Sequence, residues 1–500
     1  MARPVVWTIA GADCSGGAGI AADIKTMHSL GVEVCHVITA NTVQNAKGLY
    51  SVNPVLIDVI RMQLSTLLED KRPQTIKIGL VASDAQLLLL IDWLATLRRE
   101  NKDIQIIFDP VGQASVGGKF ATLTPRYVQQ LCAMCDVVTP NLDEASRLLT
   151  SEQQENVDTS ARELATELSK RWRNTVIVKG GHDDGESAVD HAVCFGRGLH
   201  YGLSATRIAT TYSHGSGCVF ASAIASFLAQ GYLLRDALTM SKAFIQQGLA
   251  HNDGKQGYYG AIAVAQWPVS AQFYPNVVSD VTDKYQALEV FPSLELSNNG
   301  HATEKLGLYP VVDSVSWLEQ LLPANLNIIQ LRLKNLSQEA LKEQITQAVS
   351  LCAGSNTRLF INDHWQLAIE LGAYGVHLGQ EDLADADLAA IHRAGLRLGI
   401  STHGCYEFLL AQQLQPSYLA IGAIFPTKTK DMTGQIQGVD NLRQILTLAQ
   451  DIPVVAIGGI NAERVPQVWQ TGVDSIAVVT AITEAKQPLL ATKALQKLLV

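Results

Sequence analysis

The sequence predicts an α/β protein of two domains: a three-layer α/β/α domain with a mainly parallel sheet, followed by a (β/α)8 TIM barrel. The chain of 500 residues exceeds the usual size of one domain. Short apolar runs bounded by turn residues alternate with longer helical patterns, which is typical of parallel sheets covered on both faces. This alternation lapses over residues 256–305 and then resumes with eight strand-like runs. We therefore expect domains at residues 1–255 and 306–500, joined by a linker.

The first domain begins with a strand-like run and ends with two helical patterns. Its strand-like runs lie at residues 5–10, 33–40, 75–81, 104–109, 136–139 and 175–178. Helical patterns include residues 19–30, 85–99 and 161–173, and two more follow at 217–230 and 234–251. Residues 191–208 alternate in short pieces around two glycines, which predicts an antiparallel hairpin at the sheet edge.

The second domain repeats a strand and a helix around a closed barrel. Its eight strand-like runs lie at residues 308–312, 328–333, 358–361, 375–378, 397–400, 418–423, 453–457 and 475–479. Helical patterns include residues 338–351, 383–394, 442–450, 462–470 and 488–499. Polar residues gather after the strands, where such barrels keep their active sites.

Composition limits the possible functions. A net charge of −9 gives no basic surface for nucleic acid, and the longest apolar stretch, at residues 87–97, is interrupted by Asp92. Eight scattered cysteines fit a reducing compartment, so we expect a cytoplasmic protein with no membrane or nucleic-acid partner. Cys132 and Cys135 form the one CxxC pair; two buried thiols are favoured over a zinc site, because no second pair accompanies them.

Two glycine-rich segments each precede a helix in the first domain. Residues 11–19 (GADCSGGAG) allow backbone amides to approach a ligand, but their spacing departs from GxGxxG, and a dinucleotide loop or a plain tight turn remain alternatives. Residues 211–218 (TYSHGSGC) open an Ala/Ser-rich helix, whose free N–H groups and dipole can stabilise a transferring phosphoryl group. At that position Cys218 is expected to have a lowered pKa, and the alternative is an ordinary N-cap with a buried cysteine.

Three further polar positions lie at strand ends of the same domain. Asp109, Glu144 and Lys179 each follow a strand-like run. Carboxylates there suit Mg²⁺, and the carboxyl ends of parallel strands share one edge of the sheet.

Together, residues 11–26, Thr39-Ala40 with Gln44-Asn45, Lys179-Gly-Gly-His182 and His214-Gly-Ser-Gly-Cys218 resemble hydroxymethylpyrimidine (phosphate) kinases of the ribokinase superfamily. The resemblance covers about residues 5–255. It implies a ribokinase-like fold and ATP- and Mg²⁺-dependent phosphorylation of an aminopyrimidine alcohol and then of its monophosphate.

The same resemblance implies roles for individual residues. Asp23 and Gln44 would hydrogen-bond the aminopyrimidine, Lys179 would contact the ATP phosphates, Asp109 and Glu144 would organise the metal, and Gly215, Gly217 and Cys218 would form the anion hole. Most ribokinase relatives have Asp where Cys218 stands; cysteine is usual in this branch, and the identity of the base stays open. Ser216 replaces the usual Thr and keeps its hydroxyl.

In the barrel, Gln330, Arg332 and Lys334 alternate, so they project to one side of a strand. Burying two cations is costly unless an anion such as pyrophosphate meets them; a solvated edge strand is the alternative. Asp363 and Asp382 follow the third and fourth strands and predict a Mg²⁺–diphosphate clamp. Other candidate residues lie at the ends of the third and the later strands: Asn362, Ser401, Thr427, Thr429, Lys430, Gly459, Val479 and Thr480. The loops after the seventh and eighth strands commonly bind a phosphate in such barrels.

These motifs resemble thiamine-phosphate synthases over residues 306–500. The resemblance implies the joining of hydroxymethylpyrimidine diphosphate to hydroxyethylthiazole phosphate with release of pyrophosphate. Asp363 and Asp382 would hold Mg²⁺, and Ser401 would touch the pyrimidine. The diphosphate would be held by Gln330, Arg332, Lys334, Asn362 and Lys430, and the thiazole phosphate by Thr427, Thr429, Gly459, Val479 and Thr480.

We therefore expect a bifunctional enzyme in which the kinase makes the diphosphate that the barrel consumes, with free release between the two. A homo-oligomer is possible. Two alternatives are a pyridoxal-type kinase in the first domain and a barrel that senses a phosphate ligand without catalysis.

Overall fold

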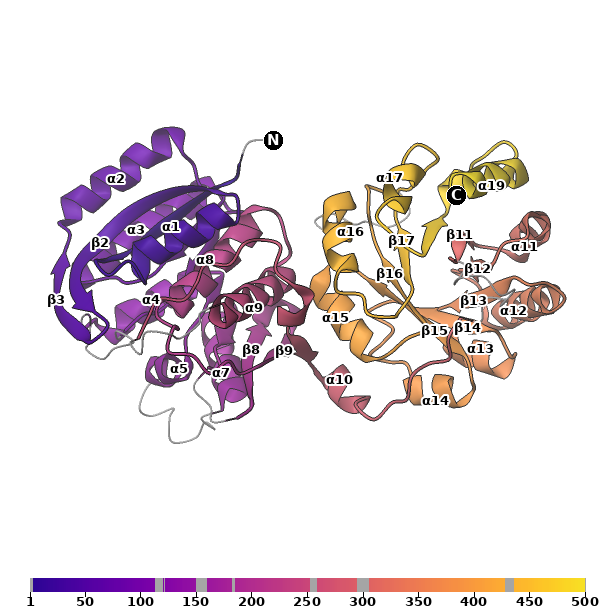
Figure 1. Ribbon diagram of the computed structural model, residues 1–500, viewed down its shortest axis with the longest axis horizontal. Helices are drawn as coiled ribbons and strands as arrows, with labels where there is room; N and C mark the ends of the chain where they lie inside the picture. The colour runs from indigo at the N-terminus through magenta and orange to yellow at the C-terminus, as the bar shows by residue number, and fades with distance from the viewer. Residues whose placement is uncertain are drawn as a thin grey trace. The chain divides into compact units, whose positions relative to one another are not determined.

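The computed structural model describes residues 3–112, 120, 122–149, 160–181, 185–251, 259–294, 305–427 and 436–499. It divides into two compact units, Met1–Ser279 and Asp280–Val500 (Figure 1). Among the described residues, no helix is both long and apolar enough to cross a membrane.

One sheet organises the described part of the first unit. In spatial order its ten strands are β10 (Asn276–Val278), β9 (Leu199–Thr206), β8 (Ser187–Cys194), β7 (Thr175–Val178), β6 (Val137–Val138), β5 (Gln105–Phe108), β4 (Thr75–Ile78), β1 (Val5–Asp13), β2 (Glu33–Asn45) and β3 (Gly48–Pro54). The strands from β7 to β2 pair in parallel, whereas β8, β9 and β10 at one edge and β3 at the other are antiparallel. The predicted edge hairpin is therefore confirmed as β8 and β9.

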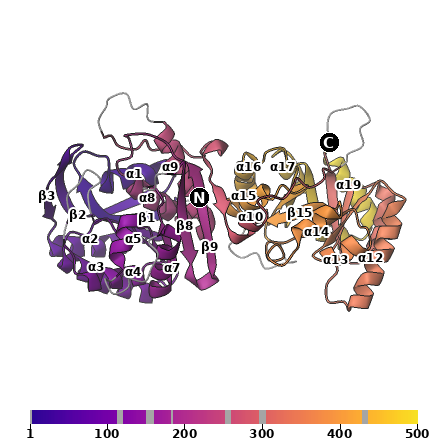
Figure 2. The same ribbon diagram turned by 90° about the horizontal axis from the view of Figure 1, so that it is seen from below.

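Helices cover both faces of this sheet, as Figure 2 shows. One face carries α1 (Gly19–Ser29) and α8 (Ser216–Ala229), with α9 (Leu234–Ala250) packed against α8 and β9. The other face carries α2 (Ile57–Asp70), α3 (Asp84–Glu100), α4 (Pro125–Met134), α5 (Leu142–Leu148) and α7 (Ala161–Trp172). The predicted three-layer α/β/α arrangement is confirmed.

The alternation of β1 explains which side chain faces which layer. Trp7 and Ile9 are fully buried in the core shared with α2, α3, α4 and α7. Thr8 points to the opposite face, where its hydroxyl reaches Asp23 on α1. Every residue of α8 from Val219 to Leu228 is buried, because this helix lies between the sheet and its neighbouring helices α1 and α9.

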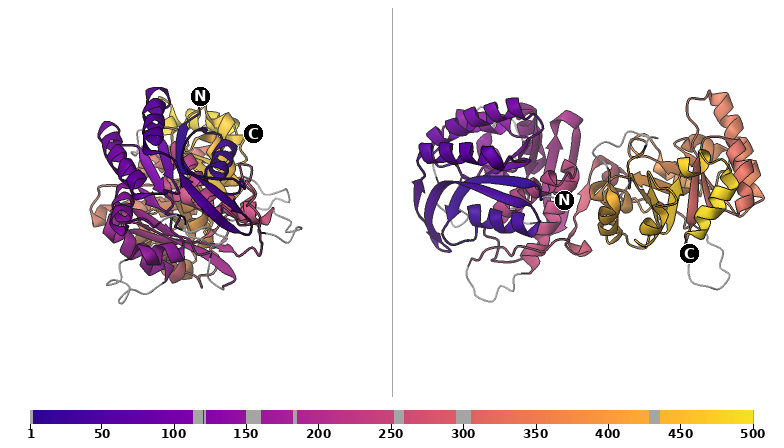
Figure 3. Two further views of the ribbon diagram at one scale, coloured as in Figure 1. Left: turned by 90° about the vertical axis from the view of Figure 1, so that its left-hand side faces the viewer. Right: turned by 90° about the horizontal axis from the view of Figure 1, so that it is seen from above.

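The described part of the second unit forms a closed barrel of eight parallel strands, which confirms the predicted TIM barrel. The strands are β11 (Gly307–Val312), β12 (Ile328–Leu331), β13 (Arg358–Asn362), β14 (Gly375–Leu378), β15 (Arg397–Thr402), β16 (Tyr418–Ile421), β17 (Val454–Ile457) and β18 (Ser475–Val478). Helices enclose them (Figures 1 and 3): α11 (Val315–Leu321), α12 (Gln338–Ala353), α13 (Trp365–Glu370), α14 (Leu388–Arg393), α15 (Cys405–Gln413), α16 (Gly438–Leu446), α17 (Val465–Trp469), α18 (Thr480–Thr483) and α19 (Pro488–Lys497).

Three aromatic rings fill the barrel interior. Tyr309 on β11, Phe360 on β13 and Tyr418 on β16 meet edge to face, with the Phe360 and Tyr418 centroids 5.1 Å apart. This packed layer closes the interior, as in other small barrels, and leaves the strand ends for a site.

Part of the region expected to be a linker packs on its neighbours. β10 extends the sheet of the first unit, and α10 (Asp280–Lys284) begins the second. The hydroxyl of Tyr285 donates to the Ala386 carbonyl at 2.7 Å, and the Phe291 amide donates to the Gln415 carbonyl at 3.1 Å.

Candidate active sites

The two glycine-rich segments of the first unit pack directly against each other. Gly215 is the N-cap of α8 and has φ of +81°, and a methyl group there would overlap the Gly17 carbonyl oxygen. Gly17 likewise leaves no room for a Cβ beside the ring of His214. Only glycine permits this approach, which brings the loop before α1 to the N-terminus of α8.

Asp13 links these two segments by hydrogen bonds. Its carboxylate accepts hydrogen bonds from the amides of Gly17 and Ala18, at 3.1 and 2.9 Å, and contacts Nε2 of His214 at 3.0 Å. Burial raises the pKa of Asp13, but hydrogen bonds from His214, Gln44 and Ser15 outweigh burial and hold that pKa below its usual range. Sequence reasoning missed this residue, although its place at the start of a glycine loop is a recognisable signal for such a turn.

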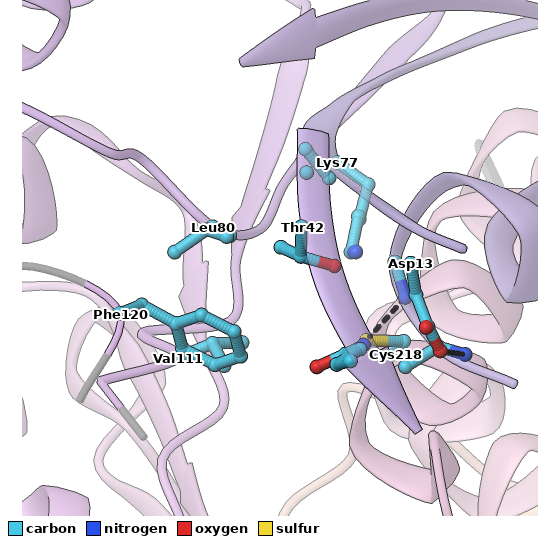
Figure 4. Close-up of a pocket in the computed structure, with 12 residues that line it drawn as sticks. Asp13, Thr42, Lys77, Leu80, Val111, Phe120 and Cys218 are labelled. Atoms are coloured by element: carbon cyan, nitrogen blue, oxygen red, sulfur yellow. Dashed lines mark hydrogen bonds between the residues drawn. The ribbon is translucent and has the colours of Figure 1, made fainter. Parts of the chain in front are cut away.

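A pocket opens beside this loop (Figure 4). Leu80, Val111 and Phe120 form one side of it, and Thr42, Lys77, Asp13 and Cys218 lie across from them. Gln44 also lines the pocket and is 8% exposed, and its Oε1 atom has no hydrogen-bond partner among the described residues. An apolar wall facing a few polar groups suits a small aromatic ligand with polar substituents.

Asp23 lies in a buried hydrogen-bond network. Its carboxylate is completely buried and accepts hydrogen bonds from Lys77 Nζ at 2.8 and 2.9 Å, Thr8 Oγ1 at 2.6 Å and Ser222 Oγ at 2.7 Å. These four bonds engage both oxygens of the carboxylate, and the contact of Asp23 with the aminopyrimidine stays a prediction. Lys77, which sequence reasoning missed, reaches the pocket.

The pKa of Cys218 differs from the expectation. Its Sγ accepts a hydrogen bond from the Gly19 amide at 3.4 Å and lines the pocket. Burial raises the pKa of its thiol to about 11; Lys77 opposes this rise, and Asp23 and Asp109 add to it. The helix N-terminus was expected to lower this pKa, but burial near two carboxylates is the larger effect.

Three of the expected phosphate and metal residues do come together at the carboxyl edge of the sheet. Lys179 Nζ donates to Asp109 Oδ1 at 2.9 Å, and a Cβ on Gly217 would lie 3.2 Å from the same Nζ. Glu144 stands in the first turn of α5, where it forms a capping box with Asn141. Burial raises the pKa of Glu144 to about 7, with Lys179 opposing the rise and Asp109 adding to it. His182 of the Lys-Gly-Gly-His motif lies outside the described residues.

In the barrel, Asp363 and Asp382 lie close together above the strand ends. Asp363 has φ of +65°, and Asp382 accepts a hydrogen bond from the Gly379 amide at 3.0 Å. Burial and the Asp382 carboxylate raise the pKa of Asp363, while Lys334 and Arg332 oppose that rise. The two cations predicted to share one side of a strand are therefore near this carboxylate pair, and Asn362 ends β13 as a buried residue beside it.

A buried chain of hydrogen bonds crosses the barrel from Gln330 to Ser401. Gln330 Nε2 donates to Tyr309 Oη at 3.3 Å, Tyr309 Oη and Tyr418 Oη are 2.8 Å apart, and His377 links Tyr418 at 2.7 Å to Ser401 Oγ at 2.8 Å. Burial and the charge of Arg332 lower the pKa of His377 to about 3, so this imidazole is neutral. Sequence reasoning missed Tyr309 and Tyr418, and it placed His377 at the end of the fourth strand without giving it a role. Polar residues within apolar barrel strands were the available signal.

The loops that follow β16 and β17 pack closely against each other. Gly459 has φ of +62°, and a Cβ there would lie 2.5 Å from the Pro426 carbonyl oxygen, next to Thr427. Arg464 Nη1 donates to the Gly459 carbonyl at 2.5 Å and stacks on Phe425, which fixes this loop. Val479 is the N-cap of α18, which begins at Thr480. Thr429 and Lys430 lie outside the described residues.

Among the described residues no cluster of three or more metal-ligating side chains occurs, so each candidate metal site is a pair of carboxylates. A helix N-terminus beside a lysine and two carboxylates, at the edge of a parallel sheet, defines the first unit as a small-molecule kinase. The second unit is a barrel that has two cations and a carboxylate pair at its strand ends, together with the last loops, where such barrels bind phosphate. These features define it as an enzyme acting on phosphorylated substrates.

Comparison with known proteins identifies both classes. The chain belongs to the phosphomethylpyrimidine kinase family, whose model matches residues 13–262, and to the thiamine monophosphate synthase family, whose model matches residues 308–482. It is 54% identical over 195 residues to a thiamine-phosphate synthase of Yersinia pestis, covering 39% of this chain and 87% of that protein. It is 56% identical over 182 residues to one of Photorhabdus laumondii, covering 36% and 84%.

Solved structures similar to the first unit include a phosphomethylpyrimidine kinase from Clostridium difficile (30% identity, 49% of this chain and 99% of that chain, TM-score 0.39). A Staphylococcus aureus pyridoxal kinase in complex with AMP-PCP and pyridoxal has 26% identity over 55% and 98% of the chains (TM-score 0.45). For the second unit, a thiamine phosphate pyrophosphorylase from Pyrococcus furiosus has 33% identity over 39% and 96% of the chains (TM-score 0.36).

The chain is thus a bifunctional transferase of thiamine biosynthesis that carries the kinase and synthase steps together. ATP is the phosphoryl donor of the kinase, and the substrates are small molecules. The sequence-based expectations for family and activity are confirmed.

Proposed function

We propose that the first unit phosphorylates 4-amino-5-hydroxymethyl-2-methylpyrimidine and then its phosphate, and that the barrel couples the resulting diphosphate to hydroxyethylthiazole phosphate. The proposal for the first unit rests on the position of Gln44. Its buried, unpartnered Oε1 lines a pocket that also contains Cys218 in the first turn of α8. An amide oxygen in that position can accept a hydrogen bond from the amino group of the pyrimidine, while Leu80, Val111 and Phe120 pack on its ring.

Phosphoryl transfer is proposed to occur at the N-terminus of α8. The amides of Gly215, Gly217 and Cys218 would meet the negative charge that develops on the transferred group. Lys179, held by Asp109, would contact the ATP phosphates. Because its pKa is raised to about 11, the Cys218 thiol stays protonated near neutral pH, which supports a part in the anion hole rather than a role as base.

Mg²⁺ is proposed for both units, and the chemistry of the donors fits it. Asp109 with Glu144, and Asp363 with Asp382, are carboxylate pairs in which one member has a raised pKa because of burial and its neighbour, and a divalent cation relieves such repulsion. The ion would neutralise phosphate oxygens and orient them. In each unit, the groups proposed to hold the ion are the two carboxylates named above.

In the barrel, the chain's cations are proposed to hold the diphosphate until it leaves. Arg332 and Lys334, with Gln330, Asn362 and Lys430, would balance the charge that grows on pyrophosphate as the C–O bond breaks. The amino group of the pyrimidine donates electrons to the resulting cation, and the thiazole nitrogen forms the new C–N bond. Ser401 would touch the pyrimidine, and Thr427, Thr429, Gly459, Val479 and Thr480 would frame the thiazole phosphate.

We also propose the kinase at residues 1–255, the synthase at 306–500 and a joining segment at 256–305, in a cytoplasmic protein that forms a homo-oligomer and binds no nucleic acid. The diphosphate is proposed to leave the first unit before the second binds it. An isotope-dilution experiment tests this: added unlabelled diphosphate should dilute the label in thiamine phosphate, and retained label would overturn free release.

A one-pot assay tests the proposed function. Pyrimidine alcohol, thiazole phosphate, ATP and Mg²⁺ should yield thiamine phosphate, measured as thiochrome after oxidation, and omission of ATP should abolish it. Turnover on pyridoxal measured alongside should be much lower. No product from folded protein, or pyridoxal as the better substrate, would refute the assignment.

A further inference from the structure

The hydrogen-bond chain inside the barrel has a direction. The Nε2 atom of Gln330 is an amide nitrogen, which donates hydrogen bonds and accepts none. Tyr309 Oη must therefore accept from it. Among the described residues, the hydroxyl hydrogen of Tyr309 then has one acceptor within reach, Tyr418 Oη at 2.8 Å. Tyr418 must in turn donate to His377 Nδ1 at 2.7 Å, because leaving a buried hydroxyl hydrogen unbonded is costly.

The direction continues to the end of the chain. If Nδ1 of His377 accepts, the hydrogen of this imidazole is on Nε2, which donates to Ser401 Oγ at 2.8 Å. All links but the last lie among side chains that are at most 6% exposed, so water does not compete with them. Ser401 therefore receives a hydrogen bond, and its own hydroxyl hydrogen is left for a ligand above the strand ends.

We propose that Tyr309, Tyr418 and His377 are positioning residues that hold Ser401 as a hydrogen-bond donor, so that the barrel selects a 4-aminopyrimidine over a 4-oxopyrimidine. The inference rests on the proposed contact between Ser401 and the pyrimidine. In a 4-aminopyrimidine the ring nitrogen beside the amino group has a lone pair, which accepts from a hydroxyl. In the 4-oxo compound that nitrogen carries a hydrogen, so two donors would face each other.

Selectivity between two substrates measures this role directly. Synthase kcat/KM would be determined for the 4-amino and the 4-oxo pyrimidine diphosphates with thiazole phosphate. Tyr418→Phe removes the hydroxyl that directs His377 but keeps the ring, and it should lower the amino-to-oxo ratio of kcat/KM by roughly 3- to 10-fold, the value of one neutral hydrogen bond. His377→Gln, which keeps a donor near Ser401, should retain more of the ratio than His377→Phe. An unchanged ratio in folded Tyr418→Phe would overturn the proposal.

A control separates selectivity from stability. Tyr285→Phe also removes a buried hydroxyl of this unit, one that bonds the Ala386 carbonyl, and it should leave the ratio unchanged. If Tyr418 acts through Ser401, then Ser401→Ala and the Ser401→Ala/Tyr418→Phe double variant should show the same ratio; additive losses would refute the chain. A wild-type ratio in Ser401→Ala would instead show that the proposed contact itself is wrong, and absence of all synthase turnover in the wild type would refute the proposed function.

Discussion

The ion pair between Lys77 and Asp23 is the most deeply buried one among the described residues of the first unit. Both side chains are 0% exposed, and Nζ lies 2.8 Å from the carboxylate. Burial alone would lower the pKa of Lys77, but Asp23, with Cys218 and Asp109, raises it above its usual range, so the amine stays charged. Lys77→Met removes that charge and leaves the Asp23 carboxylate with only the hydroxyls of Thr8 and Ser222.

The expected cost follows from this burial. Removing one partner of a buried pair costs about 3–5 kcal/mol, because an uncompensated charge remains. For a unit of this size that loss corresponds to a fall in Tm of roughly 6–20 °C. Combining Lys77→Met with Asp23→Asn should recover much of the loss, since the amide is neutral: its carbonyl accepts from one of the two hydroxyls, and its NH2 group donates to the oxygen of the other.

Thermal inactivation provides the assay, because the synthase activity of the same chain serves as an internal reference for the kinase activity. Kinase turnover should be lost at a lower temperature in Lys77→Met, whereas synthase turnover should keep its wild-type profile. Lys71→Met is the matched control: it breaks a pair with Glu33 that is largely exposed and should leave the kinase profile unchanged. A loss below about 1 kcal/mol for Lys77→Met, or a double variant less stable than the single one, would refute the argument.

Further expectations concern the two sites. Arg332→Ala should lower synthase kcat/KM by roughly 100-fold or more and leave kinase turnover intact; loss of both would contradict independent sites. The pKa of His377 is lowered to about 3 in the folded barrel, so below pH 6.5 the unfolded chain binds a proton that the folded chain does not. The free energy of unfolding of the barrel should therefore fall as the pH drops from 6.5 toward 3, by up to about 1.4 kcal/mol per pH unit. Urea unfolding of His377→Gln should lack this pH dependence. Gly215→Ala should lower kinase kcat by more than about 100-fold, and Cys218→Ala by less than about 10-fold; the reverse order in folded variants would show that the thiol is the base.

Sequence reasoning predicted those strands, helices and loops that depend on residues close together in the sequence. Periodicity located the eight barrel strands and most strands of the first unit, and glycines beside helix starts located the loop before α1 and the N-terminus of α8. It missed β3, whose alternation is weak and whose side chains are mostly exposed or half-buried at the sheet edge. It also placed the fourth barrel helix at residues 383–394, whereas α14 spans only Leu388–Arg393. The composition of residues 383–387 (LADAD) does not distinguish a helix from a packed turn.

The partners of buried polar groups could not be predicted in the same way. Lys77 stands in an apolar run and finds Asp23 fifty-four positions earlier in the chain. Tyr309 and Tyr418 meet only because the barrel closes, 109 positions apart. Such pairs depend on which strands become neighbours, and hydrophobic patterning carries no information about that.

The pKa of Cys218 shows how a local rule can fail once the fold is known. A thiol in the first turn of a helix is expected to ionise easily, and that expectation considers only the helix dipole. In the folded unit the thiol is half-buried near Asp23 and Asp109, so desolvation and two negative charges outweigh the dipole and the cation Lys77. The amides of the same turn are unaffected by this, because they carry no titratable charge. The contribution of this segment to phosphoryl transfer therefore depends on its backbone, and the glycine whose φ of +81° permits that backbone matters more than the cysteine beside it.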